Sequence, residues 1–432
     1  MSRSLIFIIY NTLFFFFVPL AFPAWVIKMW KRGGYGTGLL QRLAIYKKPI
    51  EEEPKQVLYV HAVSVGEVLI ALKLLKQWMK QYPEEHVVLA ATTATGHEVA
   101  RAEASEKLRV IYSPLDFPFV VRSVLRRFQP RQAILIESEI WPNFMKVAQQ
   151  MSIPVSIANA RLSSRSEARY QKFASFAKPV FGMLSAVYTQ NEEDSERFIR
   201  LGIDEKKVHT VGSLKFDPDG GSLPEKRGEF DDLITQFGEN QKVILAASTH
   251  AGEEKLIAQA YLNANIDNGL LIIVPRHAER RADVVSDLES LGMTVYLRTK
   301  PRQITANKPA CLIIDTTGEL RDWTAHADIA IIGKSFLADG GQNPVEAILA
   351  GVPVICGVHM GNFEPLMSHL RGEDAIMTVP AEPDQISELA SSIKKLIEND
   401  SVSSDMTGKA RARLNNHQGA VQRTIKLLHV DA

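Results

Sequence analysis

Residues 340–357 read GGQNPVEAILAGVPVICG, and this stretch decides the fold. Its middle has the spacing of a short helix and VPVIC is an apolar strand, which predicts the helix-to-strand half of a parallel α/β unit. The glycine pair lets the backbone approach a ligand closely, and the helix start offers N–H groups to a phosphate. This combination suits a nucleotide sugar; the alternative is an ordinary connection in a parallel sheet. The candidate contacts are Gly340, Gly341, Asn343 and Glu346.

The same alternation of strand and helix runs through both halves of the chain, which is typical of parallel sheets covered on both faces. In the first half the predicted strands are 57–62, 87–92, 109–114, 132–138, 154–160 and 186–190. In the second half they are 242–249, 269–276, 293–298, 310–315, 329–333, 352–357 and 375–380. We therefore predict an α/β fold with two doubly wound, Rossmann-like domains that bind ligands at the carboxyl ends of their strands.

A stretch rich in Gly, Pro and charge interrupts this alternation after Asp217 and predicts an interdomain linker. The predicted organisation is a hydrophobic membrane segment at 1–32, an N-terminal α/β domain at 33–216, a linker at 217–240 and a C-terminal α/β domain at 241–432. The last helix of the second domain can also pack back on the first domain.

The N-terminal segment from Ser4 to Ile27 contains no charged residue. A helix of this length rises ~36 Å, enough to cross a bilayer core, although Pro19 and Pro23 also allow a segment that lies in the interface. Basic residues follow the segment and outnumber those before it, which places the rest of the chain in the cytoplasm. We expect a membrane anchor; a cleaved signal peptide fits less well because the apolar stretch is long.

The bulk composition excludes some classes of protein. A formal net charge of +1 argues against a general nucleic-acid binder, which would carry a strong basic excess. The two cysteines, Cys311 and Cys356, lie in apolar strand-like runs and are expected to be buried thiols. No Cys/His cluster has metal-ligand spacing, so we predict neither a metal site nor a cofactor.

The first predicted strand runs into VSVGE, where Ser64 and Gly66 form a turn before Glu67. A carboxylate presented at a strand end can act as a general base that deprotonates a sugar hydroxyl. The alternative is a first-turn Glu favoured by the helix dipole. Thr95 and Gly96 follow the second strand, where they can hold a substrate carboxylate or, equally, belong to a helix cap.

Two more groups of charged residues end strands in the first half. Glu137 and Glu139 follow the fourth strand and could form a glycosidase-like pair. Such carboxylates more often pair with arginine, and Arg161 ends the next strand, so we favour a structural and acceptor-shaping role. Lys215 lies beside the linker, where it can reach a phosphate or carboxylate; a solvated lysine is the alternative.

The second half places polar side chains at two further strand ends. The strand at 242–249 ends in two hydroxyl side chains and is followed by a histidine, and the strand at 269–276 ends in an arginine followed by a histidine. Together these side chains form a plausible clamp for a phosphate or a base. The candidates are Ser248, Thr249, His250, Arg276 and His277.

A series of motifs in a fixed order connects the chain with a known family. They are HAVSVGE (61–67), ESEIWPN (137–143), ANARLSSRS (158–166), TQNEED (189–194), GSLKFD (212–217), STHAGEE (248–254), PRHAER (275–280) and GGQNPVEA (340–347). The set resembles the Kdo transferases, the 3-deoxy-D-manno-oct-2-ulosonic acid transferases of Gram-negative lipopolysaccharide synthesis. The resemblance covers essentially the whole chain.

The resemblance implies a GT-B architecture, with an acceptor-binding first domain and a CMP-sugar-binding second domain facing a central cleft. It implies inverting transfer of Kdo from CMP-Kdo to a lipid A precursor, of the tetraacyldisaccharide 4'-phosphate type, at the cytoplasmic face of the inner membrane. It also implies Glu67 as general base, Lys215 at the reacting groups, and Arg276 with residues 340–346 on the CMP side.

Two positions depart from the family pattern: Gln342 stands where His is usual, and Gln41 where Glu is usual. Within enzymes, the alternatives are another GT-B glycosyltransferase or a nucleotide-sugar epimerase, and release of CMP rather than UDP would exclude them. From another class, a periplasmic solute-binding protein is disfavoured by the basic residues after the N-terminal segment.

Overall fold

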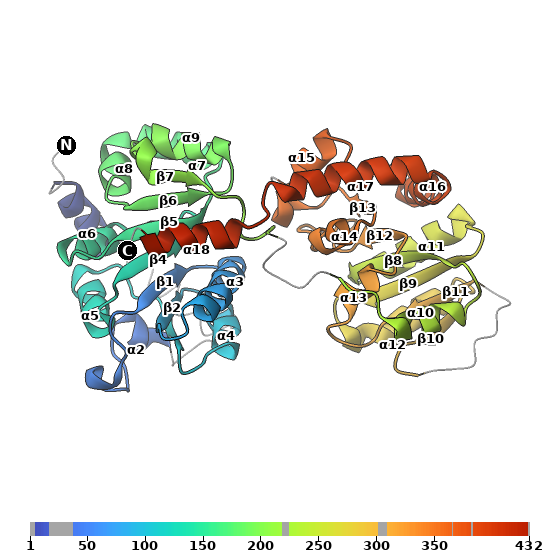
Figure 1. The fold of residues 1–432 in the computed structure, drawn as a ribbon, viewed down its shortest axis with the longest axis horizontal. Helices are drawn as coiled ribbons and strands as arrows, with labels where there is room; N and C mark the ends of the chain where they lie inside the picture. The colour runs from blue at the N-terminus through green and yellow to red at the C-terminus, as the bar shows by residue number, and fades with distance from the viewer. Residues whose placement is uncertain are drawn as a thin grey trace. The chain divides into compact units, whose positions relative to one another are not determined.

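The computed structural model describes residues 5–16, 38–217, 224–300, 309–364, 366–381 and 383–430. The chain divides into two compact units, one formed by residues 1–220 with 417–432 and the other by residues 221–416. Each unit contains a seven-stranded sheet, and the strands are paired in parallel (Figure 1). The predicted pair of doubly wound α/β domains is confirmed.

The sheet of the first unit has the strand order β3-β2-β1-β4-β5-β6-β7. Its strands are β1 (Leu58–Ala62), β2 (Val87–Ala91), β3 (Leu108–Tyr112), β4 (Gln132–Ile136), β5 (Val155–Ala160), β6 (Ala186–Thr189) and β7 (Val208–Thr210). Leu58 and Val60 enter the core on one face of the sheet, and Tyr59 enters the core on the other. Because both faces are covered, the strands are mostly apolar, and β2 (VVLAA) is apolar throughout. The order reverses between β1 and β4, where such sheets bind ligands.

The helices of the first unit cover both faces of this sheet and include the last helix of the chain. They are α2 (Gly38–Arg42), α3 (Val65–Gln81), α4 (Ala94–Ala102), α5 (Pro118–Phe128), α6 (Pro142–Gln150), α7 (Ser164–Lys172), α8 (Ala174–Phe181), α9 (Glu192–Arg200) and α18 (Ala420–Val430), with short 3₁₀ turns at Ile50–Glu52 and Glu205–Lys207. Helix α18 packs against α3. The Asp217 carboxylate fixes the start of α18 by accepting from the N–H groups of Gly419 (3.0 Å) and Val421 (2.6 Å).

Residues 5–16 form a helix that packs on the first unit. Ile6 is fully buried, and the Tyr10 hydroxyl donates to the Asp116 carboxylate at 3.0 Å. The rest of the predicted Ser4–Ile27 segment lies outside the described residues. Within the ranges that the structure describes, no helix combines the length and the apolar character needed to cross a bilayer.

The sheet of the second unit has the order β10-β11-β9-β8-β12-β13-β14. Its strands are β8 (Lys242–Thr249), β9 (Gly269–Pro275), β10 (Thr294–Leu297), β11 (Ala310–Ile313), β12 (Ile329–Ile332), β13 (Val354–Gly357) and β14 (Met377–Val379). As in the first unit, alternate residues of the central strand pack on opposite faces: Val243 on one and Ile244 on the other.

The helices of the second unit begin earlier in the chain than the sequence predicts. They are α10 (Gly228–Thr235), α11 (Glu253–Ala264), α12 (Arg281–Glu289), α13 (Leu320–Thr324), α14 (Val345–Ala350), α15 (Leu366–Gly372), α16 (Gln385–Glu398) and α17 (Asp400–Asn415), with 3₁₀ turns at Ala278–Arg280 and Gly361–Phe363. Helix α10 lies inside the predicted linker 217–240. Its Phe230 is buried and stacks on Trp323, with ring centroids 4.0 Å apart. The sequence analysis did not predict this helix, because acidic residues surround the apolar positions near Phe230.

Candidate functional site

Glu67 lies in the first turn of α3, directly after the carboxyl end of β1. Its carboxylate accepts from the N–H groups of Val63 (2.8 Å) and Ser64 (3.3 Å) and from the Ser64 hydroxyl (2.8 Å), and that hydroxyl accepts from the Glu67 N–H. This capping box leaves Glu67 only 7% exposed. The predicted turn at Gly66 is instead helical, because Gly66 belongs to the first turn of α3.

Glu137 is the centre of a cluster of charged side chains from several strand ends. Burial raises the pKa of Glu137, Glu67 raises it further, and Arg161 and Lys215 lower it. Burial and Glu67 also raise the pKa of Glu139. Desolvation lowers the pKa of Lys215, whereas Glu137 raises it. The structure therefore brings the predicted side chains at the ends of β1, β4 and β5 together with the loop after β7.

The backbone at this edge of the sheet is strained. Glu137 has a φ of 63° and Asn159 a φ of 55°, a region that side chains other than Gly rarely adopt. Asn159 is fully buried, and its side-chain oxygen accepts from the N–H of Leu214 (2.9 Å), the neighbour of Lys215. The sequence analysis missed this residue; the only signal was that Asn tolerates a positive φ better than most residues.

Gly96 is buried where the first turn of α4 meets α3. A Cβ at this position would lie 2.8 Å from the Thr93 hydroxyl and 3.3 Å from Val68, so a larger residue would push the helices apart. Thr93 caps α4 by accepting from the Gly96 N–H (3.1 Å). Thr95 is exposed in the first turn of α4. The geometry thus favours the helix-cap interpretation of this motif.

In the second unit the carboxyl ends of β9, β8 and β12 are neighbours, which brings three predicted loops to one edge. Ser248, the last residue but one of β8, has a φ of 56°. The Arg276 N–H donates to the Thr249 carbonyl (3.0 Å), and the rings of His250 and His277 are 6.2 Å apart. Arg276 and His277 are exposed. The predicted clamp residues therefore lie together.

The glycine loop before α14 depends on both of its glycines. Gly340 has a φ of 123° and Gly341 a φ of 71°. A Cβ on Gly341 would lie 2.3 Å from the sulfur of Met360, so no larger residue fits without displacing the loop. The side-chain oxygen of Asn343 accepts from the N–H of Val345, the first residue of α14 (3.1 Å).

Glu346 is half-buried in the first turn of α14. Burial raises the pKa of its carboxyl group, Arg321 lowers it and Asp322 raises it. Arg321 from α13 is thus a cation beside the predicted sugar-binding carboxylate that the sequence analysis did not identify. Gln342 keeps the loop closed through its backbone N–H, which donates to the Gly333 carbonyl (3.1 Å).

Glu253 organises this edge of the second unit and was also missed. Its carboxylate, 1% exposed, accepts from the N–H groups of His250 (2.9 Å), Lys334 (2.6 Å), Ser335 (3.0 Å) and Phe336 (3.1 Å). One buried carboxylate therefore joins the loop after β8 to the loop after β12. The motif STHAGEE placed this Glu at a helix start, but its partners lie far along the chain.

The neighbouring carboxylate has a structural use. Fully buried Glu254 accepts from the Thr249 hydroxyl (2.9 Å) and from the guanidinium of Arg280 (2.9 Å). Because the Thr249 hydroxyl already donates to buried Glu254, the Thr249 side chain stabilises the loop after β8 from its buried side.

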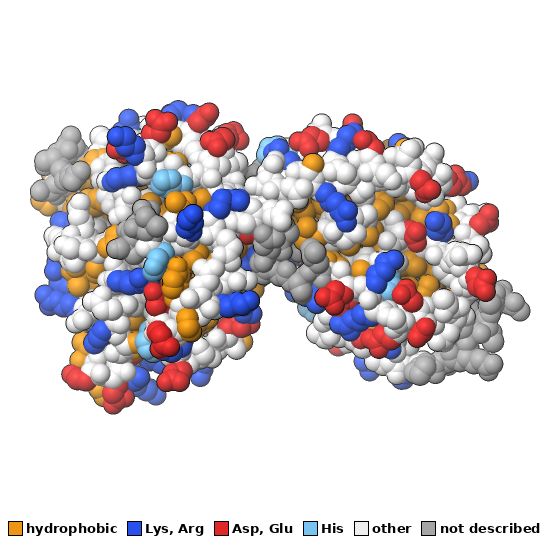
Figure 2. Space-filling model, in the orientation of Figure 1, with side chains coloured by type: hydrophobic (Ala, Val, Ile, Leu, Met, Phe, Trp, Pro, Cys, Tyr) orange, Lys and Arg blue, Asp and Glu red, His pale blue; other side chains and the backbone are white. Residues whose placement is uncertain are grey.

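Charges are mixed on the visible surface of both units, where basic and acidic side chains alternate (Figure 2). Among the described residues, no group of three or more His, Cys, Asp or Glu side chains could hold a metal ion. Gln41, one of the departures, accepts from the Tyr112 N–H (3.1 Å) and so ties α2 to the edge strand β3.

The sequence has related proteins of known name. A sequence model of the family described as 3-deoxy-D-manno-octulosonic-acid transferase (kdotransferase) matches residues 37–218. The 3-deoxy-D-manno-octulosonic acid transferase of Haemophilus influenzae is 32% identical over 378 residues, 87% of each chain. The protein of the same name from Bordetella pertussis is 32% identical over 386 residues, 86% of each chain.

Solved structures share the two-domain fold. A UDP-GlcNAc 2-epimerase from Neisseria meningitidis has a TM-score of 0.55 at 14% identity, covering 86% of this chain and 99% of that chain. A protein described as a UDP-N-acetylglucosamine 2-epimerase from Listeria monocytogenes also has a TM-score of 0.55, at 11% identity, covering 87% and 96%. At this identity the likeness concerns the GT-B-like fold alone. The relatives that match along most of the sequence decide the family: the chain belongs to the 3-deoxy-D-manno-octulosonic acid transferases, which are glycosyltransferases.

Proposed function

We propose that this enzyme transfers Kdo from CMP-Kdo to a lipid A precursor of the tetraacyldisaccharide 4'-phosphate type, with inversion at the anomeric carbon. The observation that carries the proposal is the charged cluster around Glu137, in which the carboxylates of Glu67, Glu137 and Glu139 meet two cations at one strand edge. Family membership supports the identity of the transferred sugar.

Glu67 is the proposed general base. A carboxylate offers about four lone-pair positions. In Glu67, Oε1 accepts from the Ser64 N–H and hydroxyl, while from the described residues Oε2 accepts only the Val63 N–H. Oε2 therefore keeps a position for the acceptor hydroxyl. In the proposed step Oε2 takes the hydroxyl proton, the oxygen bonds to the anomeric carbon of Kdo, and the bond from that carbon to the CMP phosphate breaks.

The cations beside Glu137 have a proposed electrostatic role. Lys215 and Arg161 both act on the Glu137 carboxylate, so they are held at the cluster before any substrate binds. Kdo carries a carboxylate and the departing CMP a phosphate, and charge-assisted hydrogen bonds to such groups are among the strongest in proteins. We assign Lys215 to the Kdo or leaving-group oxygens, and Arg161 and Glu137 to shaping the acceptor side.

The CMP moiety is assigned to the loops of the second unit. Exposed Arg276 supplies a cation, the strained Gly340–Gly341 pair lets the backbone come close, and Glu346 can accept from ribose hydroxyls. Ser248, His250, His277 and Asn343 complete the proposed lining.

The membrane surface is the proposed place of action, because the acceptor is a lipid. Leu5, Leu13, Phe15 and Phe16 of the N-terminal helix expose 45–66% of their surface. Large apolar patches of this kind mark membrane or protein contacts. Deleting residues 1–30 should lower sedimentation with vesicles, and unchanged sedimentation would contradict the anchor.

One experiment tests the whole proposal. The full chain is incubated with CMP-Kdo and a tetraacylated disaccharide 4'-phosphate, and the lipid products are weighed by mass spectrometry while CMP is quantified. The proposal predicts Kdo-bearing lipid and equivalent CMP. CMP release without a heavier lipid, or turnover of UDP-GlcNAc instead, would contradict it.

A further inference from the structure

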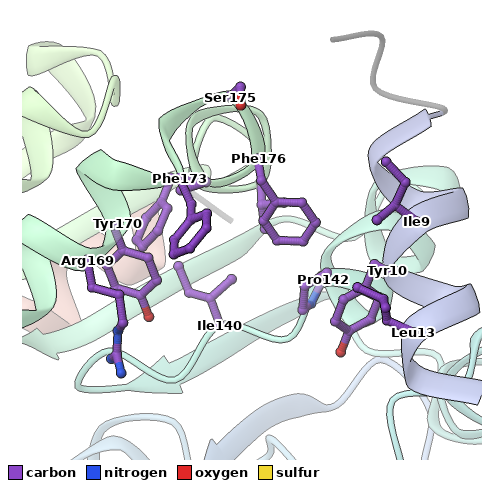
Figure 3. A pocket seen from close by; sticks show the side chains of 13 residues that line it. Ile9, Tyr10, Leu13, Ile140, Pro142, Arg169, Tyr170, Phe173, Ser175 and Phe176 are labelled. Atoms are coloured by element: carbon purple, nitrogen blue, oxygen red, sulfur yellow. The ribbon is translucent and has the colours of Figure 1, made fainter. Parts of the chain in front are cut away.

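The first unit contains an apolar pocket of about 590 Å³ that the catalytic proposal does not use. One wall is the N-terminal helix, another is α8, and the floor is the segment that leads into α6 (Figure 3). Tyr170 and Phe173 point toward Ile140, across from Ile9, Tyr10 and Leu13. A pocket of this size and polarity suits a hydrocarbon group.

Polar contacts outside the pocket hold the wall formed by the N-terminal helix. Tyr10 donates to Asp116 at 3.0 Å, and the side-chain amides of Asn11 and Asn143 exchange two hydrogen bonds at 3.1 and 2.7 Å. Asn143 is fully buried, and Asp116 also accepts from its N–H at 2.9 Å. These hydrogen bonds fix the N-terminal helix to the first unit, so this wall of the pocket is part of the folded unit.

The pocket begins where the charged cluster ends. Ile140 lines the pocket and directly follows Glu139, whose pKa Glu67 raises. On the other wall, burial raises the pKa of Tyr170, Arg169 lowers it and Glu139 raises it, so this phenol lies close to the same carboxylate. A molecule whose polar head lies at the cluster can thus extend an alkyl tail past Ile140.

The outer rim of the pocket is apolar and carries one cation. Phe173 on the rim is 58% exposed, and Ile9 is 39% exposed. Arg169 also lines the pocket, and its guanidinium lies over the Tyr170 ring, 5.7 Å from the ring centroid (Figure 3). An apolar slot with a guanidinium at its edge matches a lipid that combines alkyl chains with phosphate groups.

We propose that this pocket holds one acyl chain of the lipid acceptor while the sugar head lies at the Glu137–Glu139 turn. The inference rests on the proposed transfer to a lipid A precursor and adds where the lipid is held. The pocket then aligns the acceptor hydroxyl with Glu67, and chain length becomes a determinant of acceptor affinity.

The test compares two neighbouring residues of one helix. Ile9 lines the pocket, whereas Ile8 is 62% exposed and lies outside the lining. Ile9→Arg should raise the KM for the tetraacylated acceptor in detergent by about tenfold and leave the KM for CMP-Kdo unchanged. Ile8→Arg should change the acceptor KM by less than about twofold. Equal effects of both substitutions, or none from Ile9→Arg, would overturn the pocket.

A second matched pair covers the case in which Ile9→Arg does not fold. Phe173 lines the pocket, and Phe119, 70% exposed, does not. Phe173→Arg should raise the acceptor KM and Phe119→Arg should not.

A water-soluble acceptor without acyl chains separates the two proposals. Wild-type enzyme should use it with a KM at least about tenfold higher, and neither pocket variant should change that KM. An equal KM for both acceptors would overturn the pocket but keep Kdo transfer; no product from either would overturn the transfer itself.

Discussion

The two strand edges that carry the proposed site are built in different ways. In the first unit the charges are on side chains, and burial with like-charge contact raises the pKa of Glu137 and Glu139. In the second unit the edge is mostly backbone, ordered by one carboxylate, Glu253, and by glycines with positive φ. Burial also raises the pKa of the half-buried Glu346 carboxyl group in the second unit. In the proposed function the first edge takes the proton of the acceptor hydroxyl and the second edge holds the phosphate of CMP.

The largest effect should come from removing the proposed base. Glu67→Gln should lower kcat by about 10²–10⁴-fold, because an amide cannot take the acceptor proton. CMP affinity should not change, since Glu67 is assigned no contact with CMP. Quenched time-course assays of Kdo transfer measure kcat, and calorimetry measures CMP affinity.

A matched control separates catalysis from helix capping, since Glu67 is also part of a capping box. Asp384 caps α16 by accepting from the Ser387 N–H (3.1 Å). Asp384→Ala should cost a similar ~1 kcal/mol of stability without lowering kcat. Turnover of Glu67→Gln close to that of the wild type would refute the assignment of the base.

The second largest effect tests the backbone edge. Glu253→Ala leaves four N–H groups without their acceptor, and each buried unsatisfied group costs ~1–3 kcal/mol. The loops after β8 and β12 should separate, and CMP affinity should fall by about 10²-fold. Glu253→Gln retains one oxygen acceptor, so its CMP affinity should lie between that of the wild type and that of Glu253→Ala. If both variants fold and bind CMP as the wild type does, Glu253 has no part in ordering the donor loops.

A smaller loss of affinity is expected from Arg276→Ala, which removes one exposed cation and leaves the loop backbone intact. We expect CMP to bind about tenfold more weakly by calorimetry. Arg281→Ala, a change of the same type at a neighbouring exposed position, is the control. Equal losses in both variants would indicate a general charge effect rather than a contact.

The last prediction concerns stability and has the least effect on turnover. Burial raises the pKa of Asp116 to about 7, against 3.8 for a free carboxyl. A raised pKa means that the contribution of this group to stability is present below pH ~4 and is lost as the pH rises through ~7. Urea unfolding between pH 5 and 8 should show a steeper loss of stability in the wild type than in Asp116→Asn. Parallel slopes would show that Asp116 does not titrate in this range.

The sequence predicted the sheets well because both faces of each sheet are covered. Buried parallel strands are apolar throughout, and the predicted strand at 242–249 coincides with β8. Strand β7 was missed: it has three residues, and charged neighbours precede it. The predicted linker contained α10 because acidic residues masked the apolar positions around Phe230.

The site was predictable only as far as its residues lie at strand ends. Glu67, Glu137 and Arg161 could be read this way, since carboxyl ends of parallel strands share one edge. The role of Glu253 could not, because it depends on N–H groups more than 80 residues away in the chain. The Asn159 contact with Leu214 likewise joins distant segments through the fold.

Amide hydrogen exchange of the full chain, with and without saturating CMP, tests most directly whether CMP binds to the loops of the second unit. The account predicts slower exchange in residues 248–254, 276–281 and 333–346 of the second unit. It predicts little change at residues 63–67 and 137–141 of the first. Protection centred on the first unit's segments, with the second unit's loops unaffected, would contradict the account.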